Sequence, residues 1–231
     1  MNSTDDRSII PFNFNHQINT SSFFINSSIL KGNETISLTQ MLNNLTEVKL
    51  IYRASKDGFA ASSFHSKCDY ISNTVTIIKT TSNSVFGGFT SAKWTSYGYW
   101  TYDSNAFIFS LRRSGNSNKE RFNVTNPNYA IYSYSSYGPI FGAGYDIYVS
   151  DNSNTNVNSN SNFGYSYQLP NNINYGSTVA QRYLAGSYYW KTTEIEVYQI
   201  TPYIPYSVSY LHNGCFILLY SLKIFIKYNF F

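Results

Sequence analysis

Apolar and polar residues alternate along much of this chain, in short runs bounded by Asn, Ser and Gly. Such alternation is typical of strands with one buried face, and turn residues at both ends favour short antiparallel strands. In the last run Glu194 and Glu196 share one face and Ile195 and Val197 the other. The predicted strands are residues 48–52, 74–79, 107–111, 130–137, 145–149 and 192–200.

A first helix is predicted from a different spacing. Residues 38–45 (LTQMLNNL) carry apolar side chains at positions 38, 41, 42 and 45, which lie on one side of a helix. Ser37 or Thr39 is a suitable cap for its start, because a hydroxyl oxygen accepts a hydrogen bond from a free backbone N–H.

A second helix is predicted after the Asp57-Gly58 pair, which signals a turn because glycine accepts positive φ. Phe64 and Cys68 follow at a four-residue interval, the spacing of a buried helical stripe. Residues 178–184 predict one further helical turn. We therefore expect a mainly β fold with flanking α (α+β), namely a two-sheet antiparallel β-sandwich surrounded by a few short helices.

The 231 residues divide into three predicted parts. Residues 1–28 are an Asn- and Ser-rich flexible leader that docks one or two aromatic side chains on the domain. Residues 29–200 form one domain, a size at which β folds are routinely single. Residues 201–231 are an atypical apolar tail, too short and too charged in its final stretch for a good membrane-spanning helix.

Charge is scarce: aromatic residues make up 19% of the chain and charged residues only 12%, with a net charge of +4. Arg112-Arg113, Lys119 and Arg121 form the only local cluster, which we expect to be a solvated hairpin or loop. Because a nucleic-acid binder concentrates Lys and Arg on one face, nucleic-acid binding is not indicated. The two cysteines do not support a disulfide framework, and the first residues resemble neither a signal nor a transit peptide, so a cytoplasmic location is expected.

Several motifs, in order, resemble the TLDc domain, a module found with TBC and LysM domains. The resemblance covers roughly residues 29–200, although Val48-Lys49 stands where the family often has a tryptophan. At a second position where the family usually has a tryptophan, this chain has one, Trp94. The matching segments are residues 50–69 (LIYRASKDGFAASSFHSKCD), 84–91 (SVFGGFTS), 103–111 (DSNAFIFSL), 138–154 (GPIFGAGYDIYVSDNSN), 163–170 (FGYSYQLP) and 183–198 (YLAGSYYWKTTEIEVY).

The resemblance implies a non-enzymatic module in proteins that bind the vacuolar proton pump (V-ATPase) and protect eukaryotic cells against oxidative stress. It implies no cofactor and a protein partner, V-ATPase subunits among the candidates. An adaptor without pump contact is the first alternative. A thiol-dependent antioxidant or hydrolase that uses Cys68 and His65 is the second.

The chemistry-bearing residues have competing interpretations. His65 and Cys68 could share one helical face, but they supply too few ligands for a structural zinc, and a buried cysteine is commoner than a reactive one. Glu194 and Glu196, roughly 7 Å apart on a strand, fit either an acid–base pair or, as we prefer, a solvent-facing edge that blocks strand pairing.

Arg53 and Asp57 are spaced to pair with each other or to cap the following helix, and Asp146 and Asp151 suit turn or cap positions. The glycines at 87, 88, 138, 142 and 144 lack a phosphate-loop context and predict bulges or close backbone approach instead. No catalytic, cofactor or metal motif is found. The candidate partner-binding residues are Arg53, Asp57, Glu194 and Glu196.

Overall fold

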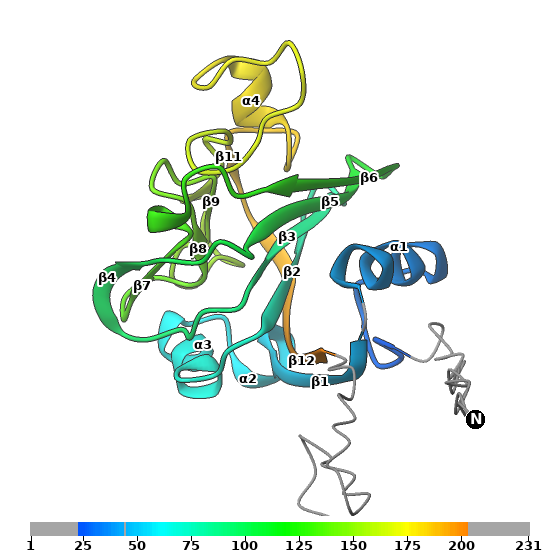
Figure 1. The fold of residues 1–231 in the computed structure, drawn as a ribbon, viewed down its shortest axis with the longest axis vertical. Helices are drawn as coiled ribbons and strands as arrows, with labels where there is room; N and C mark the ends of the chain where they lie inside the picture. The colour runs from blue at the N-terminus through cyan, green and yellow to red at the C-terminus, as the bar shows by residue number, and fades with distance from the viewer. Residues whose placement is uncertain (1–22, 44, 203–231) are drawn as a thin grey trace, which may run out of the picture.

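Two six-stranded antiparallel sheets form the centre of the molecule in the computed structural model, which describes residues 23–43 and 45–202 (Figure 1). The sheets face each other, and a few short helices lie around them. The predicted antiparallel β-sandwich with flanking helices is confirmed.

The first sheet contains the long strands of the fold. Its order is β1-β12-β2-β3-β5-β6, so the last strand of the described chain lies between β1 and β2. The strands are β1 (Leu45–Arg53), β2 (Thr74–Thr80), β3 (Val85–Thr90), β5 (Phe107–Arg113), β6 (Asn116–Asn123) and β12 (Thr192–Pro202).

The second sheet is built from shorter strands in the order β11-β10-β9-β8-β7-β4. Strand β4 is an edge strand and pairs only with β7. The predicted strands 130–137 and 145–149 are present here in shortened form. The strands are β4 (Tyr97–Thr101), β7 (Ile131–Tyr134), β8 (Ile140–Phe141), β9 (Ile147–Tyr148), β10 (Ser159–Asn160) and β11 (Tyr189–Trp190).

The helices lie at the margins of the sandwich (Figure 1). The helix predicted around Phe64 and Cys68 is present as α3, with both side chains buried. The helical turn predicted in residues 178–184 is present as α4. The helical segments are α1 (Gly32–Leu42), α2 (Ala54–Asp57), α3 (Ala61–Cys68), the 3-10 turn η2 (Pro127–Tyr129) and α4 (Thr178–Arg182).

Hydrophobic side chains bury both faces of the first sheet. One cluster fills the space between the sheets around Phe64, Trp94 and Phe141. A second cluster lies on the outer face, where Leu38 of α1 packs with Phe107 and Phe109 and with the segment of residues 23–30 that precedes α1. We call residues 23–30 the N-terminal strap. Because both faces are covered, β2 is buried at six of seven positions rather than at alternate ones.

Two aromatic side chains of the strap pack on the first sheet. Phe23 and Phe24 are buried, and the Phe24 ring packs edge-on against Tyr198 with ring centroids 4.9 Å apart. The leader before residue 23 and the apolar tail after Pro202 lie outside the described residues. Within the described part of the chain, no helix is long and apolar enough to cross a membrane.

The first helix differs from the prediction, since it begins at Gly32 rather than near residue 38, so the predicted caps Ser37 and Thr39 are wrong. Glu34 determines the start: its carboxylate accepts a hydrogen bond from the backbone N–H of Lys31 at 2.8 Å. The same carboxylate binds the buried guanidinium of Arg112 through two hydrogen bonds of 2.8 and 2.7 Å. The prediction that Arg112 belongs to a solvated hairpin or loop is therefore wrong. Arg112 attaches α1 to β5.

The paired glycines of β3 confirm the predicted close backbone approach. A Cβ on Gly87 would lie 1.9 Å from the carbonyl oxygen of Thr76 on the neighbouring strand. A Cβ on Gly88 would lie 2.5 Å from the ring of Phe141 in the opposite sheet. No side chain fits at either position: β2 and β3 approach closely at Gly87, and the two sheets meet closely at Gly88.

Candidate functional site

The four candidate partner-binding residues lie together where the end of β1 and the short helix α2 meet β12. Arg53 is the last residue of β1 and Asp57 the last of α2, while Glu194 and Glu196 come from β12. We call this group the α2 corner. The prediction that Glu194 and Glu196 face solvent is wrong: they are 8% and 0% exposed. The reason is topological, because β12 pairs with a strand on each side and is not an edge.

Glu196 is the centre of the α2 corner. Its carboxylate accepts hydrogen bonds from the hydroxyls of Ser27 (2.6 Å) and Ser28 (2.9 Å) and from the backbone N–H of Ser28 (2.8 Å). The guanidinium of Arg53 donates two more, at 3.0 and 2.8 Å, and the hydroxyl of Tyr198 donates another at 3.0 Å. A buried carboxylate with this many donors holds the N-terminal strap on the sheet.

The other two carboxylates of the corner organise α2 itself. Glu194 accepts the backbone N–H of Ser55 at 3.0 Å, in the first turn of α2. Asp57 accepts the backbone N–H of Arg53 at 2.9 Å, so it closes its own helix rather than capping the following one. Asp57 and Arg53 retain 16% and 22% side-chain exposure, so only these two candidates are partly open to a partner.

The helix start at α3 is capped from a distance. Asp151, predicted to serve a turn or a cap, accepts the backbone N–H of Ala61 at 2.7 Å. The cap prediction is therefore confirmed for Asp151, although the helix that it caps is 90 residues away in sequence.

His65 is held in place by acceptors on both sides of its ring. Nδ1 lies 2.7 Å from the carboxylate of Asp69, and Nε2 lies 2.9 and 3.0 Å from the backbone carbonyls of Tyr134 and Tyr137. His65 therefore connects α3 to the turn after β7.

The thiol of Cys68 is in an unsuitable place for a nucleophile. The residue is fully buried, and burial raises the pKa of the Cys68 thiol, with the charges of Asp69 and Asp57 adding to the rise. The thiolate is the reactive form of cysteine, and it is favoured by positive neighbours and exposure rather than by an apolar site near carboxylates. This geometry fits the packing role that the sequence favoured.

Two shallow hollows lie on the described surface. One, of about 490 Å³, adjoins α3 and is lined by Ser62, His65, Ser66, Asp69, Tyr70, Ser96 and Ser135. Its histidine and aspartate already hydrogen-bond to each other and to the fold, as does Ser96, whose hydroxyl donates to Asp69 at 2.6 Å.

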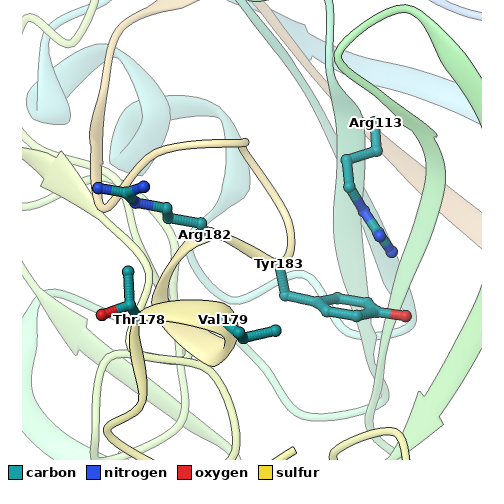
Figure 2. A pocket seen from close by; sticks show the side chains of 5 residues that line it. All are labelled: Arg113, Thr178, Val179, Arg182 and Tyr183. Atoms are coloured by element: carbon teal, nitrogen blue, oxygen red, sulfur yellow. The ribbon is translucent and has the colours of Figure 1, made fainter.

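The other hollow, of about 330 Å³, lies at α4 and is lined by Arg113, Thr178, Val179, Arg182 and Tyr183 (Figure 2). The guanidinium of Arg113 stacks 3.9 Å above the ring of Tyr183, whose hydroxyl donates to Glu120 at 2.8 Å. Figure 2 shows the guanidinium of Arg182 pointing away from Arg113. The two cations do not converge, so the hollow is no ready-made anion site.

The family model of the TLDc domain matches residues 22–201, well over half of the chain. The chain belongs to the TLDc domain family. No curated protein gave a match. The family match begins ahead of residue 29 and so includes the strap, which the structure shows to be part of this TLDc domain's core.

The carboxylate of Asp146, predicted only for a turn or cap position, organises a loop of this TLDc domain. Asp146 is fully buried, and it accepts the backbone N–H groups of Gly164 (2.6 Å), Tyr165 (3.0 Å) and Ser166 (3.0 Å). Burial raises the pKa of Asp146 to about 7, against the opposing effect of these donors. A Cβ on Gly142, at φ +80°, would lie 1.8 Å from its Oδ2, so the glycine makes room for the carboxylate.

Among the described residues of the TLDc domain, no group of three or more His, Cys, Asp or Glu side chains could hold a metal ion. The buried carboxylates instead accept hydrogen bonds from backbone and hydroxyl groups. Glu194, Glu196 and Asp146 thus position loops and strands.

Proposed function

We propose that this TLDc chain is a non-enzymatic, cytoplasmic protein-interaction module that binds the V-ATPase, regulates its assembly or activity, and supports resistance to oxidative stress. The family match over residues 22–201 carries this proposal. The pump and the stress response come from what TLDc resemblance implies, and a shared fold alone does not decide them.

The internal use of the polar groups supports the non-enzymatic part. The Cys68 thiol is buried and its pKa raised, and His65 bonds to Asp69 and two carbonyls rather than to the thiol. A nucleophile–base pair needs the two side chains within hydrogen-bond reach and the nucleophile accessible. Arg53 and Asp57 of the α2 corner are partly exposed and are candidates for partner contact.

The test is co-purification of V-ATPase soluble-sector subunits with the affinity-tagged full chain from cell lysate. The full chain is used because the strap contributes to the core. Enrichment of the soluble-sector subunits supports the proposal. A folded chain that retrieves other proteins without pump subunits overturns it in favour of the adaptor.

A charge reversal maps the contact. Lys56 is exposed within α2, beside Arg53 and Asp57, and makes no contribution to the core. If the α2 corner touches the pump, Lys56→Glu lowers pump recovery, whereas Lys119→Glu on the exposed β6 leaves it unchanged. Equal recovery by both variants would rule out the α2 corner as the contact.

A cysteine variant separates binding from thiol chemistry. Cys68→Ala avoids placing an unpaired hydroxyl in the core, and pump recovery should survive it. Loss of peroxide consumption in the folded Cys68→Ala protein would instead establish the thiol antioxidant.

A further inference from the structure

The outer face of the second sheet carries a continuous row of aromatic rings, which we call the aromatic ladder. Inward-facing Ile131 and Ser133 of β7 are buried, so their neighbours Tyr132 and Tyr134 point outward. The ladder consists of Trp100, Tyr132, Tyr134, Tyr137, Tyr148 and Tyr145, each ring in contact with the next.

The ladder is open to solvent and corrugated. Tyr134 and Tyr145 are each 40% exposed, and the other four are half-buried. Successive ring centroids are 4.6 to 6.3 Å apart, with interplanar angles from 19° to 77°. Rings tilted against each other at this spacing make an uneven aromatic surface rather than a flat one.

Few charged side chains lie near the ladder, exposed Asp151 near Tyr148 among them. Between residues 127 and 149 the only charged residue is Asp146, which is fully buried, and β4 (YGYWT) has none. The edge strands of the first sheet contrast with it: β6 carries Lys119, Glu120 and Arg121. An occupant of the ladder therefore gains little from charge, and an uncharged segment suits the contact.

The hydrogen-bonding groups of the ladder can all donate, and its five phenol oxygens can also accept. Its five phenols and one indole N–H can donate, and the one amide paired directly with a ladder residue is Asn160 of β10, opposite Tyr148. Tyrosine hydroxyls are protonated near neutral pH, so all five can donate. A ligand with many free acceptors can use the row of hydroxyl donors.

We propose that the aromatic ladder binds an uncharged, proline-rich segment of a partner protein in the polyproline II conformation. Such a segment has no internal hydrogen bonds, so its carbonyls are free to accept, and proline has no N–H to satisfy. Aromatic-lined grooves are the usual receptors for it. Two residues of this helix rise by about 6 Å, close to one ring-to-ring step of the ladder.

The three tryptophans provide a direct test by nuclear magnetic resonance. The ¹⁵N-labelled full chain is titrated with a peptide of about twelve prolines, about 37 Å long as polyproline II. Only the indole signal of Trp100 should shift, and saturably. The indoles of Trp94 and Trp190 are buried and donate to Thr74 (2.9 Å) and Ser161 (3.1 Å), so their signals should stay in place.

Two lysine variants complete the test. Tyr134→Lys removes a central ring and adds a charge, and should weaken binding by about tenfold or more, or about 1.4 kcal/mol. Tyr189→Lys is the matched control, because Tyr189 is 58% exposed on β11 of the same sheet but outside the ladder. Unchanged Trp94 and Trp190 signals show that each variant is folded.

Three outcomes would overturn the proposal. The first is the absence of any Trp100 shift with the proline peptide. The second is equal binding by Tyr134→Lys and the wild type. The third is a Trp100 shift with cellohexaose or a Gly-Ser peptide of equal length that matches or exceeds the shift with prolines, which would assign the ladder to glycans or to non-selective contact.

Discussion

At the scale of single residues, three buried carboxylates of this TLDc domain hold loops and strands in place. Glu196, Glu194 and Asp146 are buried and accept hydrogen bonds from backbone, hydroxyl or guanidinium groups. A buried charge is tolerated only when it is paired or hydrogen-bonded, so each of these carboxylates requires the loop or strand that supplies its donors. Charge in this domain therefore specifies tertiary contacts.

Asp146 should make stability depend on pH. Its pKa is raised to about 7 in the fold, against about 3.9 in an unfolded chain. Between these values the folded state binds more protons than the unfolded state, so the free energy of unfolding falls as pH rises. The slope reaches about 1.4 kcal/mol per pH unit at most, and the contribution is constant above pH 7.

Urea unfolding of the wild type and Asp146→Asn at several pH values between 4 and 8 measures this effect. Asparagine does not titrate, and distant groups contribute equally to both proteins. The free energy of unfolding of the wild type minus that of Asp146→Asn should therefore decrease as the pH rises from 4 to 7. Parallel curves would contradict the raised pKa.

At the scale of elements, the attachment of α1 depends on one buried ion pair. Glu34 closes the first turn of α1 through Lys31 and binds Arg112 of β5 with both oxygens. The helical spacing of residues 38–45 indicated the helix, but not its first six residues. Those residues are mostly polar, and what stabilises them is a partner 78 positions away.

Arg112→Lys should lower the free energy of unfolding by about 2 kcal/mol, because lysine keeps the charge but loses the two-pronged contact with the carboxylate. Arg182→Lys makes the same chemical change on an exposed residue, and we expect an effect within about 0.5 kcal/mol. Chemical denaturation of both variants measures the difference. Equal losses would show that the Glu34 pair does not hold α1.

At the scale of the whole molecule, the first sheet is covered on both sides: by the second sheet on one face, and by α1 and the strap on the other. The strap is fixed at two points, through its buried phenylalanines and through the carboxylate of Glu196. Its removal would expose the outer hydrophobic cluster.

Glu196→Gln should lower the free energy of unfolding by about 2 to 4 kcal/mol, because it leaves Arg53 without its charge partner and weakens the contacts to the strap. It should also speed proteolytic cleavage within residues 23–30. Glu47→Gln, an exposed residue of the neighbouring β1, is the control and should change stability by less than about 0.5 kcal/mol. A stable Glu196→Gln protein with a protected strap would contradict the role assigned to Glu196.

The sequence by itself determined the family, the sandwich class and the approximate positions of most elements, because alternation, turn residues and helical spacing are local properties of the chain. Only the tertiary structure decided that Glu194 and Glu196 are buried and that aromatic rings from β4, β7 and β9 join into one ladder. Both depend on strand order, which places residues distant in sequence side by side. Local patterns show which faces a strand has, but not what will cover them.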